Sequence, residues 1–253
     1  MNKIFLSTFV AAAFAVGANA QVLIGSSSGS QYTTATWTNG APNAFAGWFI
    51  VNGGGGALNN ISDSTQNGRT SIGSQSFFIV GGTNGSFIDV YAPLGGLLAS
   101  GQSISLSANY SWTSGTRGIE FTSSGGLFRF EHSGSDALFL KGTGITDTEI
   151  SANVFNQALT YNVSYSNATS VNIGVSLFGN PTPFFTTNVT VANMPNEIKF
   201  YVGGITDSSL ANQNNYGLYF NAVTTVPEPS TYALLALSAA AIGGYAARRR
   251  ARK

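Results

Sequence analysis

The sequence predicts an all-β protein, an antiparallel two-sheet jelly-roll sandwich, with a signal helix at the N-terminus and a single transmembrane helix at the C-terminus. Apolar and polar residues alternate with a period of two through most of the chain, which is typical of strands that bury one face. Clusters of Gly, Asn and Pro separate these runs at intervals of about 10 to 15 residues, as turns separate antiparallel strands. No amphipathic helical pattern competes with them, and residues 147–156 are expected to form one helical turn at most.

Residues 1–20 have the three parts of a secretory signal peptide. Lys3 gives a positive start, residues 4–17 are apolar, and the small residues Ala18 and Ala20 stand where signal peptidase accepts them. We therefore predict cleavage after Ala20. The alternative, a retained membrane helix, is disfavoured because this apolar run falls short of the roughly 20 residues that a spanning helix needs.

Residues 21–225 form the predicted β-sandwich, with about eleven strands. The clearest strand is residues 104–112, where Ile104, Leu106 and Tyr110 share one face and serines occupy much of the other. We expect the first face to lie in the core and the second to face solvent. The remaining predicted strands are residues 77–80, 87–91, 118–121, 127–131, 137–140, 161–165, 171–178, 184–191, 198–202 and 217–223.

The order of these strands resembles the concanavalin-A-like jelly roll of exported lectins and laminin-G-like domains. A serine-alternating strand (104–112), a Gly-x-x-Phe strand (118–121) and a Gly-Leu-Phe-Arg-Phe strand (126–130) follow one another, and residues 216–223 give a closing strand. The resemblance covers residues 36–223. It implies the sandwich fold and carries no invariant motif of an activity.

The composition excludes several classes of function. Only 8% of residues are charged, and residues 21–225 carry five basic residues against nine acidic ones, a net charge of −4. A nucleic-acid partner is excluded, because phosphate binding needs clustered basic residues. Cysteine is absent, so disulfides and thiolate metal sites do not stabilise the fold.

Residues 226–253 have three parts. Residues 226–231 contain two prolines, which keep the chain extended because they lack an amide hydrogen and restrict the residue before them. Residues 232–247 are apolar and would form a transmembrane helix of about 24 Å. Residues 248–253 form a basic stop-transfer tail, which keeps the C-terminus cytoplasmic and the sandwich outside. Its basic residues are Arg248, Arg249, Arg250, Arg252 and Lys253.

The same tail resembles a known sorting signal. A Pro-Glu-Pro motif (Pro227, Glu228 and Pro229), an apolar helix and an arginine cluster occur in this order in the PEP-CTERM signal of Gram-negative bacteria. The resemblance implies that an exosortase, a membrane-embedded transpeptidase-like enzyme, recognises the motif and removes the helix. It implies a destination and no activity. The alternative is an ordinary single-span anchor behind a proline-rich linker.

Glu120 and Glu131 are the candidate carboxylates for glycan hydrolysis, which needs a pair of acids. Glycosidases on the resembled fold carry a Glu-x-Asp-x-x-Glu strand, and this chain has none, so we predict two solvent-facing strand positions and no catalytic residue. His132 is the only histidine. It cannot relay directly to Glu131, because adjacent strand residues point to opposite faces, and we predict that it lies in a turn.

The candidate ligand-binding residues are aromatic or acidic. Trp37, Trp48 and Tyr216 are the candidate glycan contacts, with core packing as the alternative for each ring. Residues 147–149 (Asp-Thr-Glu) could bind Ca²⁺ through two carboxylates. We predict no cofactor and no metal, with Ca²⁺ as the less favoured alternative.

Together these features predict a non-enzymatic, exported surface or extracellular-matrix protein, associated with exopolysaccharide or biofilm. Its expected partners are signal peptidase, an exosortase-type membrane protease, the membrane through the C-terminal helix, and exopolysaccharide. It would cross the inner membrane, be anchored transiently, and end at the cell surface or outside the cell. The alternatives are a carbohydrate-binding, lectin-like module and a weak glycan hydrolase on the same fold.

Overall fold

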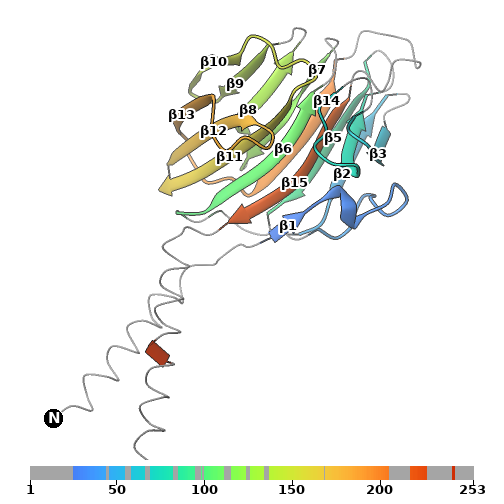
Figure 1. The fold of residues 1–253 in the computed structure, drawn as a ribbon, viewed down its shortest axis with the longest axis horizontal. Helices are drawn as coiled ribbons and strands as arrows, with labels where there is room; N and C mark the ends of the chain where they lie inside the picture. Colours follow the sequence, from blue (N-terminus) through green and yellow to red (C-terminus); the bar gives the residue numbers. More distant parts are fainter. Residues whose placement is uncertain are drawn as a thin grey trace, which may run out of the picture. The chain divides into compact units, whose positions relative to one another are not determined.

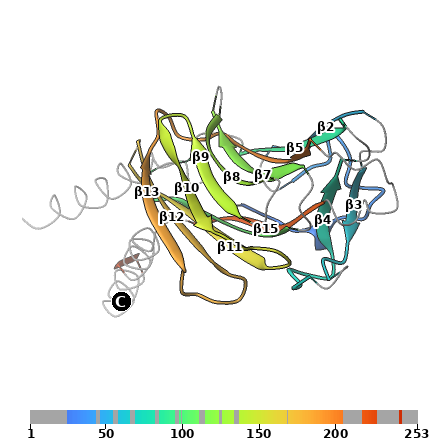
Figure 2. The same cartoon turned by 90° about the horizontal axis from the view of Figure 1, so that it is seen from above.

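The chain folds into two antiparallel β-sheets, both within the unit Leu23–Val226. The computed structural model describes residues 25–43, 46–54, 58–65, 69–81, 85–94, 98, 100–110, 115–123, 126–133, 137–167, 169–204, 217–226 and 241–242. In Figure 2 the strands of the two sheets form two separate layers, as in a β-sandwich. The predicted all-β sandwich is therefore confirmed.

Sheet A has eight strands, of which β4 is labelled in Figure 2 and the others in Figure 1. In order across the sheet they are β13 (Phe185–Thr190), β12 (Ser170–Leu177), β11 (Ala158–Asn167), β6 (Ser103–Tyr110), β15 (Leu218–Val226), β4 (Ser76–Val80) and β3 (Leu58–Ser62). The short strand β1 (Gly25–Ser27) pairs with β15 beyond the part that β4 covers, and a 3-10 helix, η1 (Gly29–Gln31), follows it. Strand β15, which leads to the C-terminal segment, therefore lies inside the sheet.

Sheet B has seven strands. Their order is β10 (Ile145–Ser151), β9 (Leu138–Gly142), β8 (Gly126–Ser133), β7 (Thr116–Thr122), β14 (Glu197–Gly203), β5 (Phe87–Pro93) and β2 (Phe49–Gly53). Because β14 pairs with both β7 and β5, residues distant in sequence become neighbours on the sheet.

The core lies between the sheets and is rich in aromatic rings. Phe200 of sheet B stacks on Phe220 of sheet A, with ring centroids 3.7 Å apart, and Phe77 lies 5.1 Å from Phe220. All three are fully buried. The alternating apolar residues of the strands therefore lie on the inner face of each sheet, and the two inner faces pack together to form the core.

Two details of the predicted fold are wrong. A helical turn was expected within residues 147–156, but residues 145–151 form the strand β10. Most side chains of β10 are exposed, so its sequence does not alternate between apolar and polar residues. The polar face of β6 is also not fully solvated, because Ser107 and Asn109 are buried. The segment 69–75 covers this face: the Asn109 side chain donates to the Thr70 carbonyl, and Asn221 of β15 donates to Gln75.

The predicted terminal helices, residues 1–20 and 232–247, lie outside the described residues, apart from Ala241 and Ile242, which are helical. Among the described residues, no helix is both long enough and apolar enough to cross a bilayer. Strand β15 continues to Val226, so the sandwich ends directly before Pro227.

Candidate functional site

Charged side chains cluster on the outer face of sheet B, although only 8% of the residues in the chain are charged. Arg129, Lys141 and Lys199 project from it, and they are three of the five basic residues in the predicted sandwich. Strand register places them in one row with their partners. The row runs Tyr91, Lys199, Glu120, Arg129, Lys141 across β5, β14, β7, β8 and β9. We call this surface the charged face.

A second row lies beside the first and contains a glycine with a structural role. It runs Asp89, Tyr201, Gly118, Glu131, Phe139. A Cβ on Gly118 would stand 2.2 Å from the Phe130 carbonyl oxygen and 2.7 Å from the Tyr201 hydroxyl. The missing side chain lets the Tyr201 ring lie across the sheet, and its hydroxyl donates to Glu131 Oε2 at 3.2 Å.

Glu131 is the centre of the ion pairs on this face. Arg129 Nε lies 2.7 Å from its Oε2, Lys141 Nζ lies 2.7 Å from its Oε1, and the side chain is 10% exposed. Burial raises the pKa of Glu131, but the hydrogen bonds and charges of Lys141 and Arg129 outweigh burial and hold that pKa below its ordinary value. Glu131 is therefore ionised near neutral pH.

Glu120 has a partner of its own. Lys199 Nζ lies 2.8 Å from Glu120 Oε2, and the Glu120 side chain is 15% exposed. Burial lowers the pKa of Lys199, but the hydrogen bond and charge of Glu120 outweigh it and raise that pKa above its ordinary value. Both glutamates lie on the outer face of sheet B, as predicted, but neither is the solvent-facing position that was expected, because their side chains are only 10% and 15% exposed under their ion pairs.

Asp89 is a third carboxyl on the charged face, and sequence reasoning missed it. Burial raises its pKa, while the charge of Lys199 and a 3.3 Å hydrogen bond from the Tyr91 hydroxyl lower it only in part. The signal in the sequence was an acid enclosed by Phe, Val and Tyr in a predicted strand.

His132 lies in strand β8 and not in a turn, so that prediction is wrong. Its ring is fully buried and stacks on Tyr110, with centroids 5.7 Å apart. Burial, aided by the charge of Arg117, lowers the pKa of His132 to about 3. The predicted separation from Glu131 is confirmed, because Glu131 faces outward while His132 faces the core. No triad is formed by these neighbours.

Two of the three candidate glycan contacts are corrected. Trp37 and Trp48 are 0% and 2% exposed and pack edge to face at 5.9 Å, so they are core residues that no glycan reaches. Tyr216 lies outside the described residues. Among the described residues, the exposed aromatic side chains are instead four phenylalanines. Phe49 and Phe87, at 51% and 40%, lie beside the charged face on β2 and β5, and Phe178 and Phe184, at 44% and 47%, lie between β12 and β13.

The candidate Ca²⁺ site, residues 147–149, lies on strand β10. Lys141 Nζ is 3.7 Å from Asp147 Oδ2 and would compete with a cation for this carboxylate. In the described parts of the chain, no group of three or more His, Asp or Glu side chains is placed to hold a metal ion. The cleavage residues Ala18 and Ala20, the motif Pro227 to Pro229, and the tail 248–253 lie outside the described residues.

Comparison with known families identifies the C-terminal segment. Residues 225–250 match the PEP-CTERM protein-sorting motif. The sandwich and this motif define the class of the protein: an exported β-sandwich protein with a C-terminal sorting signal. The predicted Pro-Glu-Pro signal is therefore confirmed as a motif. No curated protein matches the chain.

Solved structures resemble the sandwich at low identity. A sialidase is 14% identical with a TM-score of 0.48 over 72% of this chain, which spans only 17% of the sialidase. The carbohydrate esterase vb_24B_21 of Shiga toxin-encoding bacteriophage phi24B is 12% identical, with a TM-score of 0.47 and coverage of 72% and 91%. Caenorhabditis elegans galectin LEC-6 is 13% identical, with a TM-score of 0.38 and coverage of 59% and 95%. No activity is taken from these likenesses.

Proposed function

We propose that this chain is a non-enzymatic protein of the bacterial surface or extracellular matrix, processed at its tail by an exosortase and associated with extracellular polysaccharide. The observation that carries the proposal is the sorting motif at residues 225–250, which begins where strand β15 ends. A protease that binds an extended peptide needs one held away from folded structure. The two prolines supply it, because neither can donate a hydrogen bond to the sheet.

The ion pairs of the charged face support the non-enzymatic part of the proposal. Glu131 is bound by two cations, whose hydrogen bonds and charges hold its pKa below the ordinary value, and Glu120 is bound by one cation, Lys199. A retaining or inverting glycosidase needs one of its two carboxyls protonated. The charged face instead links four strands through its side chains. Lys199 and Glu120 join β14 to β7, Lys141 and Glu131 join β9 to β8, and the Tyr201 hydroxyl joins β14 to β8.

The sorting proposal predicts a change in mass at the C-terminus. The protein extracted from its host is expected to lack Arg252 and Lys253. When Pro227, Glu228 and Pro229 are all replaced by alanine, we expect the full tail to be retained, because the protease loses its recognition motif. Intact-mass spectrometry of the extracted protein measures both states.

A matched control is available within the chain. Pro181 and Pro183 have the same spacing in the exposed loop between β12 and β13, and their replacement by alanine should leave the C-terminal processing unchanged. If the unmodified protein still carries Arg252 and Lys253, the processing proposal is wrong and a plain membrane anchor replaces it.

The non-enzymatic proposal predicts no turnover of glycans. Reducing-end release from a panel of polysaccharides should stay at the buffer level for the unmodified protein. Turnover that disappears in Glu120→Gln, Glu131→Gln or Asp89→Asn would instead establish a hydrolase on the charged face. Glu120 and Glu131 are informative positions because each is a carboxylate of the charged face, held by Lys199 and Lys141 respectively.

A further inference from the structure

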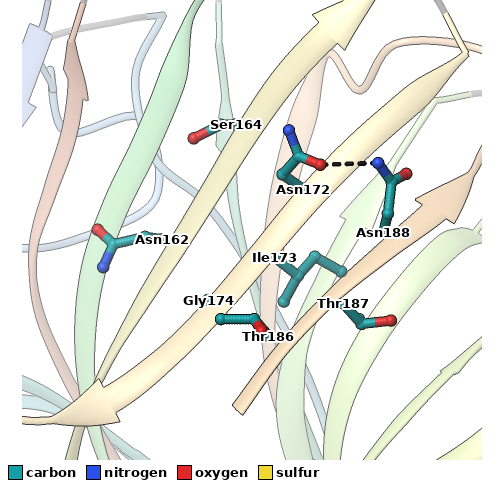
Figure 3. Close-up of a pocket in the computed structure, with 8 residues that line it drawn as sticks. All are labelled: Asn162, Ser164, Asn172, Ile173, Gly174, Thr186, Thr187 and Asn188. Atoms are coloured by element: carbon teal, nitrogen blue, oxygen red, sulfur yellow. Dashed lines mark hydrogen bonds between the residues drawn. The ribbon is translucent and has the colours of Figure 1, made fainter. Parts of the chain in front are cut away.

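The outer face of sheet A differs in chemistry from the charged face. Residues 150–196, which form the strands β11, β12 and β13, contain no Asp, Glu, Lys, Arg or His. Most of their exposed side chains are amides and hydroxyls, and Leu177, at the end of β12, is an apolar exception at 44% exposed. This uncharged face is hollowed into a shallow groove of about 430 Å³, whose lining residues are drawn in Figure 3.

A glycine forms the floor of the groove. Gly174 lies opposite Asn162 on β11 and Thr186 on β13, and its missing side chain leaves space between them. A Cβ at this position would meet only Pro183, at 3.6 Å. The Pro183 ring therefore borders the groove with an apolar surface, and Phe184, the next residue, is 47% exposed.

A chain of hydrogen bonds orients the amides beside this floor. The Ser170 hydroxyl donates to Asn188 Oδ1 at 2.9 Å, and Asn188 Nδ2 donates to Asn172 Oδ1 at 2.7 Å, the bond dashed in Figure 3. The chain runs in one direction and ends at the amide nitrogen of Asn172. That nitrogen has donors to offer a ligand lying toward Ser164 and Asn162, on the neighbouring strand.

We propose that this groove binds a segment of a neutral polysaccharide chain. Sugar hydroxyls both donate and accept hydrogen bonds, as amides and hydroxyls do, so the groove satisfies them without a charge. An acidic polysaccharide would find no cation in the groove to neutralise it. An apolar ligand would cover the exposed amides of Asn162 and Asn172 and leave them without hydrogen-bond partners. The apolar border at Pro183 suits the C–H face of a sugar ring. The inference rests on the proposed function, which places the sandwich among extracellular polysaccharide.

Native gel electrophoresis of the protein purified from its host, in gels cast with dextran, galactomannan or alginate, tests the proposal. We expect dextran or galactomannan to retard the protein and the acidic alginate not to do so. Asn172→Ala should weaken the retarding interaction about tenfold, the size expected for loss of a hydrogen-bonding group. Gly174→Val should abolish it, because the strand tolerates the new side chain while the groove is filled.

Asn52→Ala, a matched change at an exposed position on sheet B, should bind as the unmodified protein does. The proposal is overturned if neither neutral polysaccharide retards the protein, if alginate retards it more strongly, or if both groove variants bind normally. These outcomes are separate from the sorting experiment. A trimmed tail without retardation refutes only the groove, whereas a retained tail with retardation refutes only the processing.

Discussion

Replacing Phe220 by alanine is expected to lower the free energy of unfolding by about 3 to 5 kcal/mol, the range for a buried phenylalanine whose site cannot collapse. The ring stacks on Phe200 at 3.7 Å and lies 6.0 Å from Trp37 and 6.2 Å from Trp48. Both sheets contribute to this cluster. The void left by the ring would therefore lie between two stiff layers, and neither layer can close on it without breaking its register.

Urea denaturation followed by tryptophan fluorescence measures this loss, because Trp37 and Trp48 are part of the same cluster. Phe49→Ala is the matched control: the same side chain is removed from a strand of sheet B, but it is 51% exposed. We expect the control to cost well under half as much. Equal losses in the two variants would show that Phe220 does not hold the sheets together.

Most of the strands that the sequence predicts alternate between a buried and a more exposed face. Strand β4 is an exception, because all five of its residues are buried. The strands β4 to β9 and β11 to β15 all overlap predicted runs. Strands β2 and β10 end the order of sheet B and expose residues on both faces, so their patterns lack a period of two. The error at β6 has another origin: Asn109 is covered by segment 69–75, and no local pattern reveals such a distant contact.

The candidate sites were less predictable than the fold. Glu120 and Glu131 are identified by residue type, but the partner of Glu120 is Lys199, whose strand β14 becomes a neighbour of β7 only through the crossover order of sheet B. The partners of Glu131 are local, on β8 itself and on the next strand, β9. Pairing order is a non-local property. The tryptophans are candidate glycan contacts by their chemistry, with core packing as the alternative, and the choice between the two depends on which segments pack over β4. The C-terminal sorting motif could be predicted because it is defined by consecutive residues and does not depend on distant contacts.

His132 is expected to make the folded state sensitive to mild acid. Its pKa is lowered to about 3 in the folded protein, against an ordinary value of 6.5. The unfolded chain therefore binds a proton first, and stability is complete above 6.5 and is lost as the pH falls toward the folded value. Between pH 6.5 and about pH 5 the free energy of unfolding should fall by up to roughly 1.4 kcal/mol per pH unit.

His132→Phe separates this effect from the rest of the protein. Neither ring nitrogen of His132 has a hydrogen-bond partner among the described residues, so phenylalanine keeps the stacking on Tyr110 and removes two unsatisfied polar atoms. Arg117, the buried cation opposite His132 on β7, remains in both proteins. Urea denaturation across this pH range should then give a nearly constant stability for the variant. A variant that loses stability with acid as steeply as the unmodified protein would assign the sensitivity to other groups.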